Sequence, residues 1–218
     1  MTSDCEALAD VANPLGLEGV EYLEYRSAQP HALGHVLELM GFRPVARHRS
    51  REVLLYRQGG MNVVVNAHGA APNEPPVLSA IALRVRDAAA AHRRVLDLGG
   101  WDVPVTVAPM EPHIPAIHGV GASRIYFVDR WREFAIYDVD FVPIPGVERQ
   151  PPALQGLHWF GVVQYIGLGR SADWSSSTVR CSASPSSAMN GDRCAAAGHG
   201  VAKPERRPAP AACRARAG

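Results

Sequence analysis

The sequence predicts an α+β fold in which two βαβββ modules pair into one curved, mostly antiparallel sheet, followed by a disordered C-terminal tail. Two observations carry this prediction. The order strand, helix, strand, strand, strand occurs twice, with a period of about 60 residues, which indicates an internal duplication. The last 44 residues contain no Leu, Ile, Phe, Tyr or Trp, so they cannot bury enough apolar surface to offset the entropy of ordering.

The first module begins with alternating apolar and polar residues in GVEYLEYR, a pattern typical of a half-buried strand. Apolar residues at helical spacing in HALGHVLELM predict a helix over residues 31–40, which Gly41 ends. Gly59 and Gly60 form a hairpin turn between the last two strands. The strands of this module are expected at residues 19–26, 42–48, 52–58 and 61–66.

The second module repeats this order. Asp87 is suited to cap an Ala-rich helix over residues 88–98, which ends at Gly99 and Gly100. Residues 109–121 are rich in Pro and Gly and are expected to form a loop. The strands are expected at residues 78–85, 101–107, 124–129 and 134–142. The two curved modules would enclose a pocket, with the helices outside.

A third unit begins but does not continue. The run GLHWFGVVQYIG predicts a strand over residues 157–166, and Asp173 would cap a following helix. That helix does not follow, because the sequence becomes SSSTVRCSAS. We therefore divide the chain into a leader (1–15), a two-module domain (16–145), a linker (146–155), the start of a third unit (156–174) and the tail (175–218).

Composition and charge exclude several classes of function. The formal net charge of +1 leaves no electrostatic footprint for nucleic acid or for an acidic membrane. The sequence has no secretory signal and no apolar run long enough to span a bilayer, so we expect a cytoplasmic protein. Cys181, Cys194 and Cys213 lie in the tail without a CxxC pair, and His199 adds no second ligand pair. Free thiols are therefore favoured over a zinc site.

Other polar residues admit both a functional and a structural interpretation. His48, His113 and His118 could form a metal cluster, although exposed or hydrogen-bonded histidines are commoner. Asp138 and Asp140 alternate in IYDVDF and could act as paired carboxylates, although polar positions on a half-exposed strand explain them more simply. The sequence Gly119-Val120-Gly121 lacks the spacing of a phosphate loop and predicts a turn.

Four stretches resemble the N-terminal half of 4-hydroxyphenylpyruvate dioxygenases, a family of the vicinal-oxygen-chelate superfamily. They are NPLGLEGVEYLEY, MGFRPVARHRSREVLLYRQGGMNVVVN, IPAIHGVGASRIYFVDR and IYDVDFVPIPGVER. The resemblance covers about residues 13–174. It implies a paired βαβββ architecture, in agreement with the repeat found in the residues themselves.

The resemblance also implies an activity and a metal. In this family the N-terminal module pair carries no catalytic metal, and the C-terminal pair holds Fe(II) on two histidines and one glutamate. The implied substrates are O₂ and a 2-oxo acid, 4-hydroxyphenylpyruvate, which is converted to homogentisate in tyrosine degradation. His158 matches the first iron ligand, whereas Gly161 replaces the histidine that usually follows it by three residues. The other two ligands do not appear in residues 175–218, so no catalytic or further cofactor-binding residue is assigned.

A shift of reading frame explains the tail. Codons for SSSTVRCSAS can be chosen so that one G added after the Trp174 codon makes the same DNA read VEFYGALFGF. That peptide is the amphipathic helix that the third unit lacks. The chain as written is then an incomplete, inactive dioxygenase, which would form a homo-oligomer if it folds. Two alternatives stay open: a non-catalytic module of the same fold, or the dioxygenase-like domain of a dehydroshikimate dehydratase-type protein. A second His and a Glu in the true frame would favour the dioxygenase, and resequencing across Trp174 tests the shift.

Overall fold

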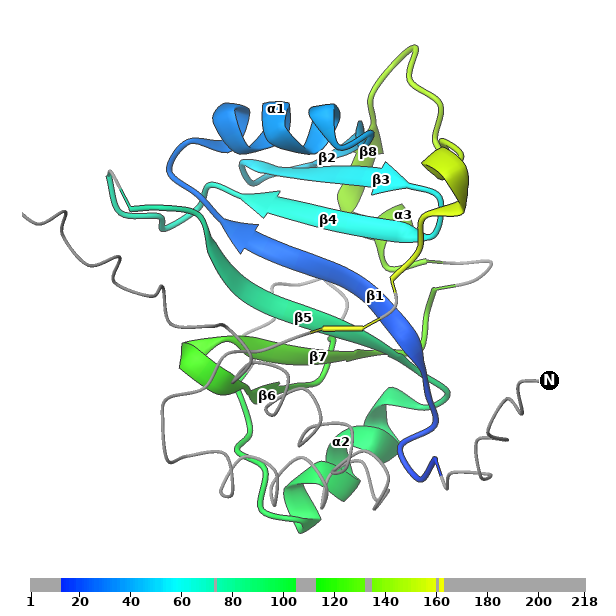
Figure 1. Cartoon of the computed structure of the whole chain (residues 1–218). Coiled ribbons are helices and arrows are strands. Elements are labelled where there is room, and N and C mark those ends of the chain that lie inside the picture. The colour runs from blue at the N-terminus through cyan, green and yellow to red at the C-terminus, as the bar shows by residue number, and fades with distance from the viewer. Residues whose placement is uncertain (1–12, 73, 105–112, 132–134, 160, 163–218) are drawn as a thin grey trace, which may run out of the picture.

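The computed structural model describes residues 13–72, 74–104, 113–131, 135–159 and 161–162. Within them, eight strands form one mixed sheet in the order β6-β7-β5-β1-β4-β3-β2-β8 (Figure 1). The strands are β1 (Leu17–Arg26), β2 (Arg43–His48), β3 (Val53–Gln58), β4 (Met61–Asn66), β5 (Val77–Val85), β6 (Ala116–His118), β7 (Arg124–Val128) and β8 (Phe141–Pro143). The helices are α1 (Pro30–Leu39), α2 (Ala88–Asp97) and α3 (Tyr137–Asp140), with 3₁₀ turns at Val120–Ala122 and Leu154–Gly156.

The pairing of the strands confirms the duplication. In the first module β1 pairs in parallel with β4, and in the second β5 pairs in parallel with β7. The two modules join through the antiparallel pair of β1 and β5 at the centre of the sheet. The remaining pairs are antiparallel, so the predicted α+β architecture with a mostly antiparallel sheet is confirmed.

Local signals place the two long helices where the sequence predicts them. Pro30 occupies the first turn of α1, where its missing N–H costs nothing. Gly41 follows this helix with a φ of 91°, a conformation that glycine adopts without strain. At α2, the Asp87 carboxylate accepts a hydrogen bond from the Ala90 N–H at 2.8 Å, which confirms the predicted cap.

Both long helices cover the same face of the sheet, and α3 lies on the other (Figure 1). The α1 face is packed against Tyr56, Val63 and Val65 of β3 and β4. The α2 face is packed against Val85 and Phe127 of β5 and β7. Tyr22, Leu55, Val64 and Ala82 point to the opposite face and pack with Tyr137 of α3. The inner surface that the sequence assigns to a pocket is therefore the α3 face.

Two predicted strands of the second module differ in the structure. The described part of the first, residues 101–104, is reduced to an isolated antiparallel bridge between Asp102 and Ile117, and residues 105–107 lie outside the described part. Two backbone hydrogen bonds support this bridge, from the His118 N–H to the Trp101 carbonyl at 2.9 Å and from the Val103 N–H to the Ala116 carbonyl at 3.1 Å. The sequence also missed β6, which lies within the predicted loop and pairs with β7.

The stretch predicted as a strand over residues 134–142 instead contains α3 and β8. The Asp138 carboxylate accepts a hydrogen bond from the Ala135 N–H at 2.9 Å, so the side chain stabilises a helical turn in place of an extended chain. β8 then pairs with β2 of the first module rather than extending the second. Asp138 and Asp140 therefore do not share a strand face, and the interpretation of paired carboxylates on a strand is wrong.

The predicted strand over residues 157–166 is absent from its described part. Leu157, His158 and Trp159 have no strand partner among the described residues, which explains why they form no strand. The linker before them lies against the β3–β4 hairpin, where the Gly59 N–H donates to the Pro151 carbonyl at 2.8 Å. The third unit beyond residue 162, its Asp173 cap and the three tail cysteines lie outside the described residues. Within the described residues, no helix is both long and apolar enough to cross a membrane.

Candidate functional site

A cavity of about 390 Å³ lies between the α3 face of the sheet and the segment that carries α3. Strands from both modules line it, with Leu55 and Arg57 from β3, Asn62 from β4 and Arg84 from β5. A volume of this size falls within the range of small-molecule sites. It is therefore one candidate site among the described residues.

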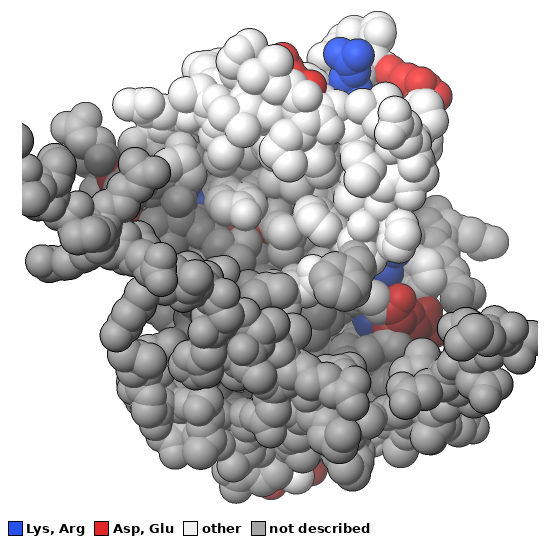
Figure 2. Space-filling view, in the orientation of Figure 1, with Lys and Arg blue, Asp and Glu red and all other residues white. Residues whose placement is uncertain are grey.

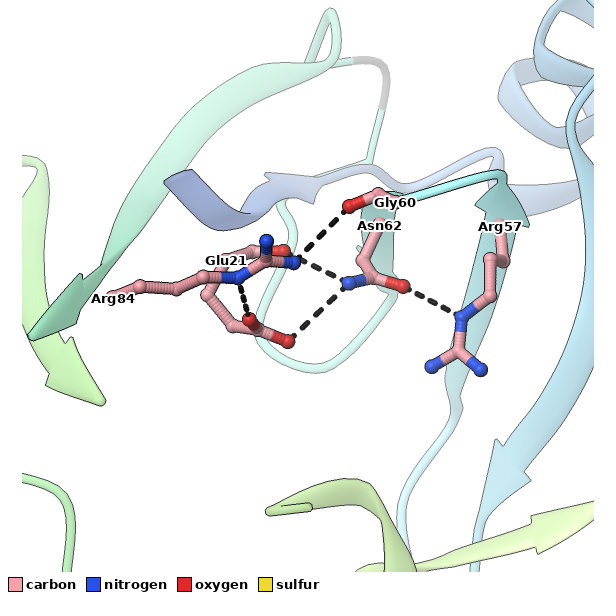
Figure 3. A network of polar contacts seen from close by, with 5 residues as sticks. All are labelled: Glu21, Arg57, Gly60, Asn62 and Arg84. Carbon is pink, nitrogen blue, oxygen red and sulfur yellow. Dashed lines mark hydrogen bonds and ion pairs between the residues drawn. The ribbon is translucent and has the colours of Figure 1, made fainter. Parts of the chain in front are cut away.

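A network of polar side chains joins four strands at this cavity (Figure 3). The Glu21 carboxylate forms a short ion pair with Nε of Arg84. Asn62 Nδ2 donates to the Glu21 backbone carbonyl at 2.9 Å and to Glu21 Oε1 at 3.3 Å. Asn62 Oδ1 accepts from Arg57 Nε at 2.7 Å. The network therefore links two guanidinium groups through one buried carboxylate and one amide.

An irregularity in β1 brings Glu21 into this network. Val20 pairs with Leu83 and Tyr22 pairs with Ala82, so Glu21 is an extra residue on its strand. Such a bulge changes the direction of the side chains around it. As a result Glu21 lines the cavity while its neighbour Tyr22 contacts Tyr137 on the same side of the sheet. Glu21 is only 2% exposed, so its ion pair with Arg84 compensates a buried charge.

Two aromatic side chains form the wall of the cavity opposite the sheet. The Arg57 guanidinium lies over the Tyr137 ring, 5.4 Å from its centroid. The Arg84 guanidinium lies over the Trp131 ring at 5.2 Å. Cation–π contacts of this kind are worth about 0.5–2 kcal/mol each. The two arginines therefore hold the α3 segment against the sheet.

A second cavity of about 440 Å³ lies on the same face, on the other side of Tyr137. Its walls carry charges of both signs, including Glu24, Arg124 and Asp140. The Asn66 side chain donates to Glu24 Oε1 at 2.9 Å, and Arg124 Nη1 donates to the Tyr126 hydroxyl at 3.4 Å. Glu24 and Arg124 thus already have hydrogen-bond partners in this cavity.

The buried phenols predict a loss of stability at alkaline pH. Burial raises the pKa of Tyr137 well above its ordinary value, and the nearby Glu21 carboxylate raises it further. Burial, followed by the charge of Glu24, also raises the pKa of Tyr22. Both phenols ionise in the unfolded chain near an ordinary pKa of about 10. Above that pH the unfolded state binds fewer protons than the folded state, so the free energy of unfolding falls.

Urea unfolding between about pH 8 and about pH 11 measures this effect. The free energy of unfolding should fall as the pH rises through about 10, and Tyr137→Phe should make that fall shallower. An equally steep fall in Tyr137→Phe would contradict the assignment of the effect to this phenol.

The predicted iron ligand is exposed at the surface. His158 Nδ1 lies 3.2 Å from the carbonyl oxygen of Gly156, two residues away. In the described part of the chain, no three His, Cys, Asp or Glu side chains are placed to hold a metal ion. The described residues therefore do not fit an iron site, and His158 stays a prediction that needs ligands from elsewhere.

The three histidines that could have formed a metal cluster are not brought together either. His48 is half-buried against the Phe141 ring, with 5.4 Å between ring centroids, and its Nδ1 accepts from the Ser50 N–H at 3.2 Å. His113 and His118 are exposed. Gly119 precedes a 3₁₀ turn at Val120–Ala122, so the predicted turn is confirmed.

Most of the side chains that line the cavity were not among the predicted site residues, and Asp138 is the exception. Asn62 interrupts the apolar run MNVVV, whereas Glu21 fits the alternation of GVEYLEY. A polar residue buried in a strand needs a partner, so Asn62 was the available signal, and nothing local marked Glu21 as buried. The partners come from other strands, and their identity is set by the register of the sheet.

Comparisons with known proteins agree with this architecture. Residues 11–142 match the family described as hydroxyphenylpyruvate dioxygenase, HPPD, N-terminal. The chain is 42% identical over 146 residues to 4-hydroxyphenylpyruvate dioxygenase of Pseudomonas sp. (strain P.J. 874), a match that covers 64% of this chain and 41% of that protein. The chain thus spans about two fifths of the length of this relative.

Two further proteins are similar as well. The chain is 39% identical over 134 residues to 3-dehydroshikimate dehydratase of Pseudomonas aeruginosa, covering 57% of this chain and 21% of that protein. A solved structure of a xylose isomerase-like TIM barrel/4-hydroxyphenylpyruvate dioxygenase fusion protein superposes with a TM-score of 0.52 and 34% identity, covering 62% of this chain and 23% of that chain. The family match spans more than half of the sequence and agrees with the paired modules, so the chain belongs to the hydroxyphenylpyruvate dioxygenase family, whose N-terminal domain residues 11–142 match.

Proposed function

We propose that this chain supplies the N-terminal, non-catalytic domain of an Fe(II)-dependent dioxygenase that converts 4-hydroxyphenylpyruvate to homogentisate. The observation that carries the proposal is the match of residues 11–142 to the N-terminal domain of that family. In the intact enzyme, we expect Fe(II) to be held by the C-terminal half and to activate O₂ beside the bound 2-oxo acid. The chain as written would not perform the oxidation.

The position of His158 supports the inactivity of the chain alone. Its imidazole is exposed and meets no second metal ligand among the described residues. One imidazole lacks the chelation that a facial triad of two histidines and one carboxylate provides. The contribution of this chain would then be structural, through a sheet that both modules share and a network that joins β1, β3, β4 and β5.

Contacts with further protein are part of this proposal. Val36, Leu39 and Met40 of α1 are 50%, 75% and 57% exposed. Uncharged side chains also cover most of the described surface on the side shown in Figure 2. Exposed apolar patches commonly mark protein–protein contacts. We therefore expect the folded chain to self-associate.

A second candidate is a dioxygenase-like domain within a dehydroshikimate dehydratase-type protein. The similarity to 3-dehydroshikimate dehydratase and to the TIM-barrel fusion protein favours it. The two candidates differ in what is fused to this domain. Sequencing the gene in both directions distinguishes them, because a dehydratase-type protein would place a TIM-barrel sequence in the same open frame.

A chimera tests the dioxygenase proposal directly. The chain up to Gln155 is joined to the C-terminal half of the Pseudomonas sp. relative, and O₂ uptake and homogentisate are measured with Fe(II), ascorbate and 4-hydroxyphenylpyruvate. The chimera is expected to turn over, whereas the unmodified chain and the isolated C-terminal half should consume no more O₂ than iron and ascorbate alone. A folded chimera without homogentisate, or robust turnover by the unmodified chain, would overturn the proposal.

A further inference from the structure

Arg57 is a half-buried cation without an acidic partner in the described part of the chain. Its Nε donates to Asn62 Oδ1 at 2.7 Å, and its Nη1 donates to the Arg149 carbonyl at 2.9 Å. Both acceptors are neutral, and no carboxylate lies in ion-pair distance among the described residues. A guanidinium has five N–H donors, so these two bonds leave donors at its Nη end.

The neighbouring arginine, Arg84, does have an acidic partner. Arg84 is neutralised by its ion pair with Glu21, and its Nη2 donates to the Gly60 carbonyl at 3.1 Å. The network therefore contains two guanidinium groups and one buried carboxylate, which leaves one positive charge uncompensated (Figure 3). Figure 3 also shows that the Nη end of Arg57 points away from Asn62 and out of the network. A partly buried positive charge favours the binding of an anion.

The cavity beside Arg57 has both polar and apolar walls. Asp138, Arg149 and Gln150 line part of it, so with Arg57 and the paired Arg84 and Glu21 its lining carries three positive and two negative groups. Val45, Ala46 and Leu55 are 3%, 8% and 1% exposed and form the part contributed by the sheet. Phe141 and Tyr137 contribute aromatic rings from the opposite side. At about 390 Å³ the cavity has room for a ligand with a compact apolar body.

We propose that this cavity binds a small organic carboxylate, with the carboxylate on the Nη end of Arg57 and a flat apolar body between Leu55 and the rings of Phe141 and Tyr137. Arg is suited to this role, because its planar fork can donate two parallel hydrogen bonds to one carboxylate. The site is independent of iron and lies in the module pair to which the family assigns no metal. It therefore holds whether or not the chain belongs to an active dioxygenase.

Benzoate is the probe, and benzamide, which has nearly the same shape without the charge, is its matched control. The full chain, labelled with ¹⁵N, is titrated with each compound and followed by NMR. Saturable benzoate binding is expected at about millimolar concentration, as befits so small a ligand, with benzamide at least about tenfold weaker. The indole N–H resonance of Trp131, assigned through Trp131→Phe, should shift on binding, whereas that of the exposed Trp101 should not.

Two variants test the role of Arg57. Arg57→Gln should weaken benzoate binding by about tenfold or more, whereas Arg47→Gln, which removes an exposed arginine of the adjacent strand β2, should leave it unchanged. If Arg57→Gln does not fold, Arg57→Lys keeps the charge without the fork and should weaken binding by a smaller factor. Equal binding of benzamide, unchanged binding in the folded Arg57 variant, or no saturable binding overturns the proposal. Because the readout needs neither iron nor turnover, its failure is separate from a failure of the dioxygenase assignment.

Discussion

Phe127→Ala is expected to lower the free energy of unfolding by about 3–5 kcal/mol, the usual cost of truncating a buried aromatic side chain. Phe127 is 2% exposed and lies in β7, which pairs in parallel with β5 in the second module. Its ring packs with Val85, Ala91 and Val95, so it joins the sheet to α2. Urea unfolding of the full chain, followed by far-ultraviolet circular dichroism, measures the change.

Trp101→Ala is the matched control. It removes a larger aromatic side chain, but one that is 77% exposed, so the free energy of unfolding should change by no more than about 0.5 kcal/mol. Equal losses in the two variants would mean that the Trp101 side chain is buried and not exposed as the structure has it. A small loss in Phe127→Ala would mean that α2 does not cover the sheet as the structure has it.

These two aromatic residues mark the limit of what local sequence patterns predict. The strand pattern of β1, the apolar spacing of α1, the glycine hairpin and the Asp87 cap all specify structure within a few residues. All four elements are confirmed, although a bulge interrupts the alternation of β1 at Glu21. The duplication then predicts the module pair, because each element has a counterpart about 60 residues away. Trp101 is an aromatic residue of the kind common in strands, but no local signal shows whether another element covers its side chain.

The elements that were missed depend on partners far away in the sequence. β6 is only three residues long and is held by β7, and β8 is held by β2, which lies almost a hundred residues earlier. Short strands have little intrinsic preference, and tertiary pairing decides their conformation. The turn at α3 depends on the side chain of Asp138, which stabilises a helical turn where the alternation IYDVDF favours a strand.

In the candidate site, too, the sequence predicts single residues but not the contacts between distant ones. His158 was identified through the family resemblance, yet its environment could not be known, because the other ligands are not near it in the described chain. Glu21, Asn62 and Arg84 come from three strands, and a one-residue bulge in β1 brings the first of them to the others. A bulge moves a side chain to a new direction without a clear sequence signal, so the network required the register of the sheet.

Glu21→Met is expected to lower the free energy of unfolding by about 3 kcal/mol, the lower end of the range for breaking a buried ion pair by removing one partner. The loss arises because Arg84 keeps its charge in a site where its acceptor is gone. The Arg84 side chain is 23% exposed, so water reaches part of it and limits the cost. Asn62 retains its bond to the Glu21 backbone carbonyl at 2.9 Å, which Met at position 21 also provides.

The double variant Glu21→Met/Arg84→Met decides whether the ion pair is the cause. Replacing both partners with apolar side chains of similar length leaves no unpaired charge, so the double variant should be more stable than Glu21→Met alone. The coupling energy of the cycle, from urea unfolding of the four proteins, should favour the pair by at least about 1 kcal/mol. Additive losses would show that the two side chains stabilise the sheet separately, and that the carboxylate serves packing rather than neutralisation. A favourable coupling supports one step of the binding proposal as well: if Glu21 neutralises Arg84, the remaining positive charge beside the cavity belongs to Arg57.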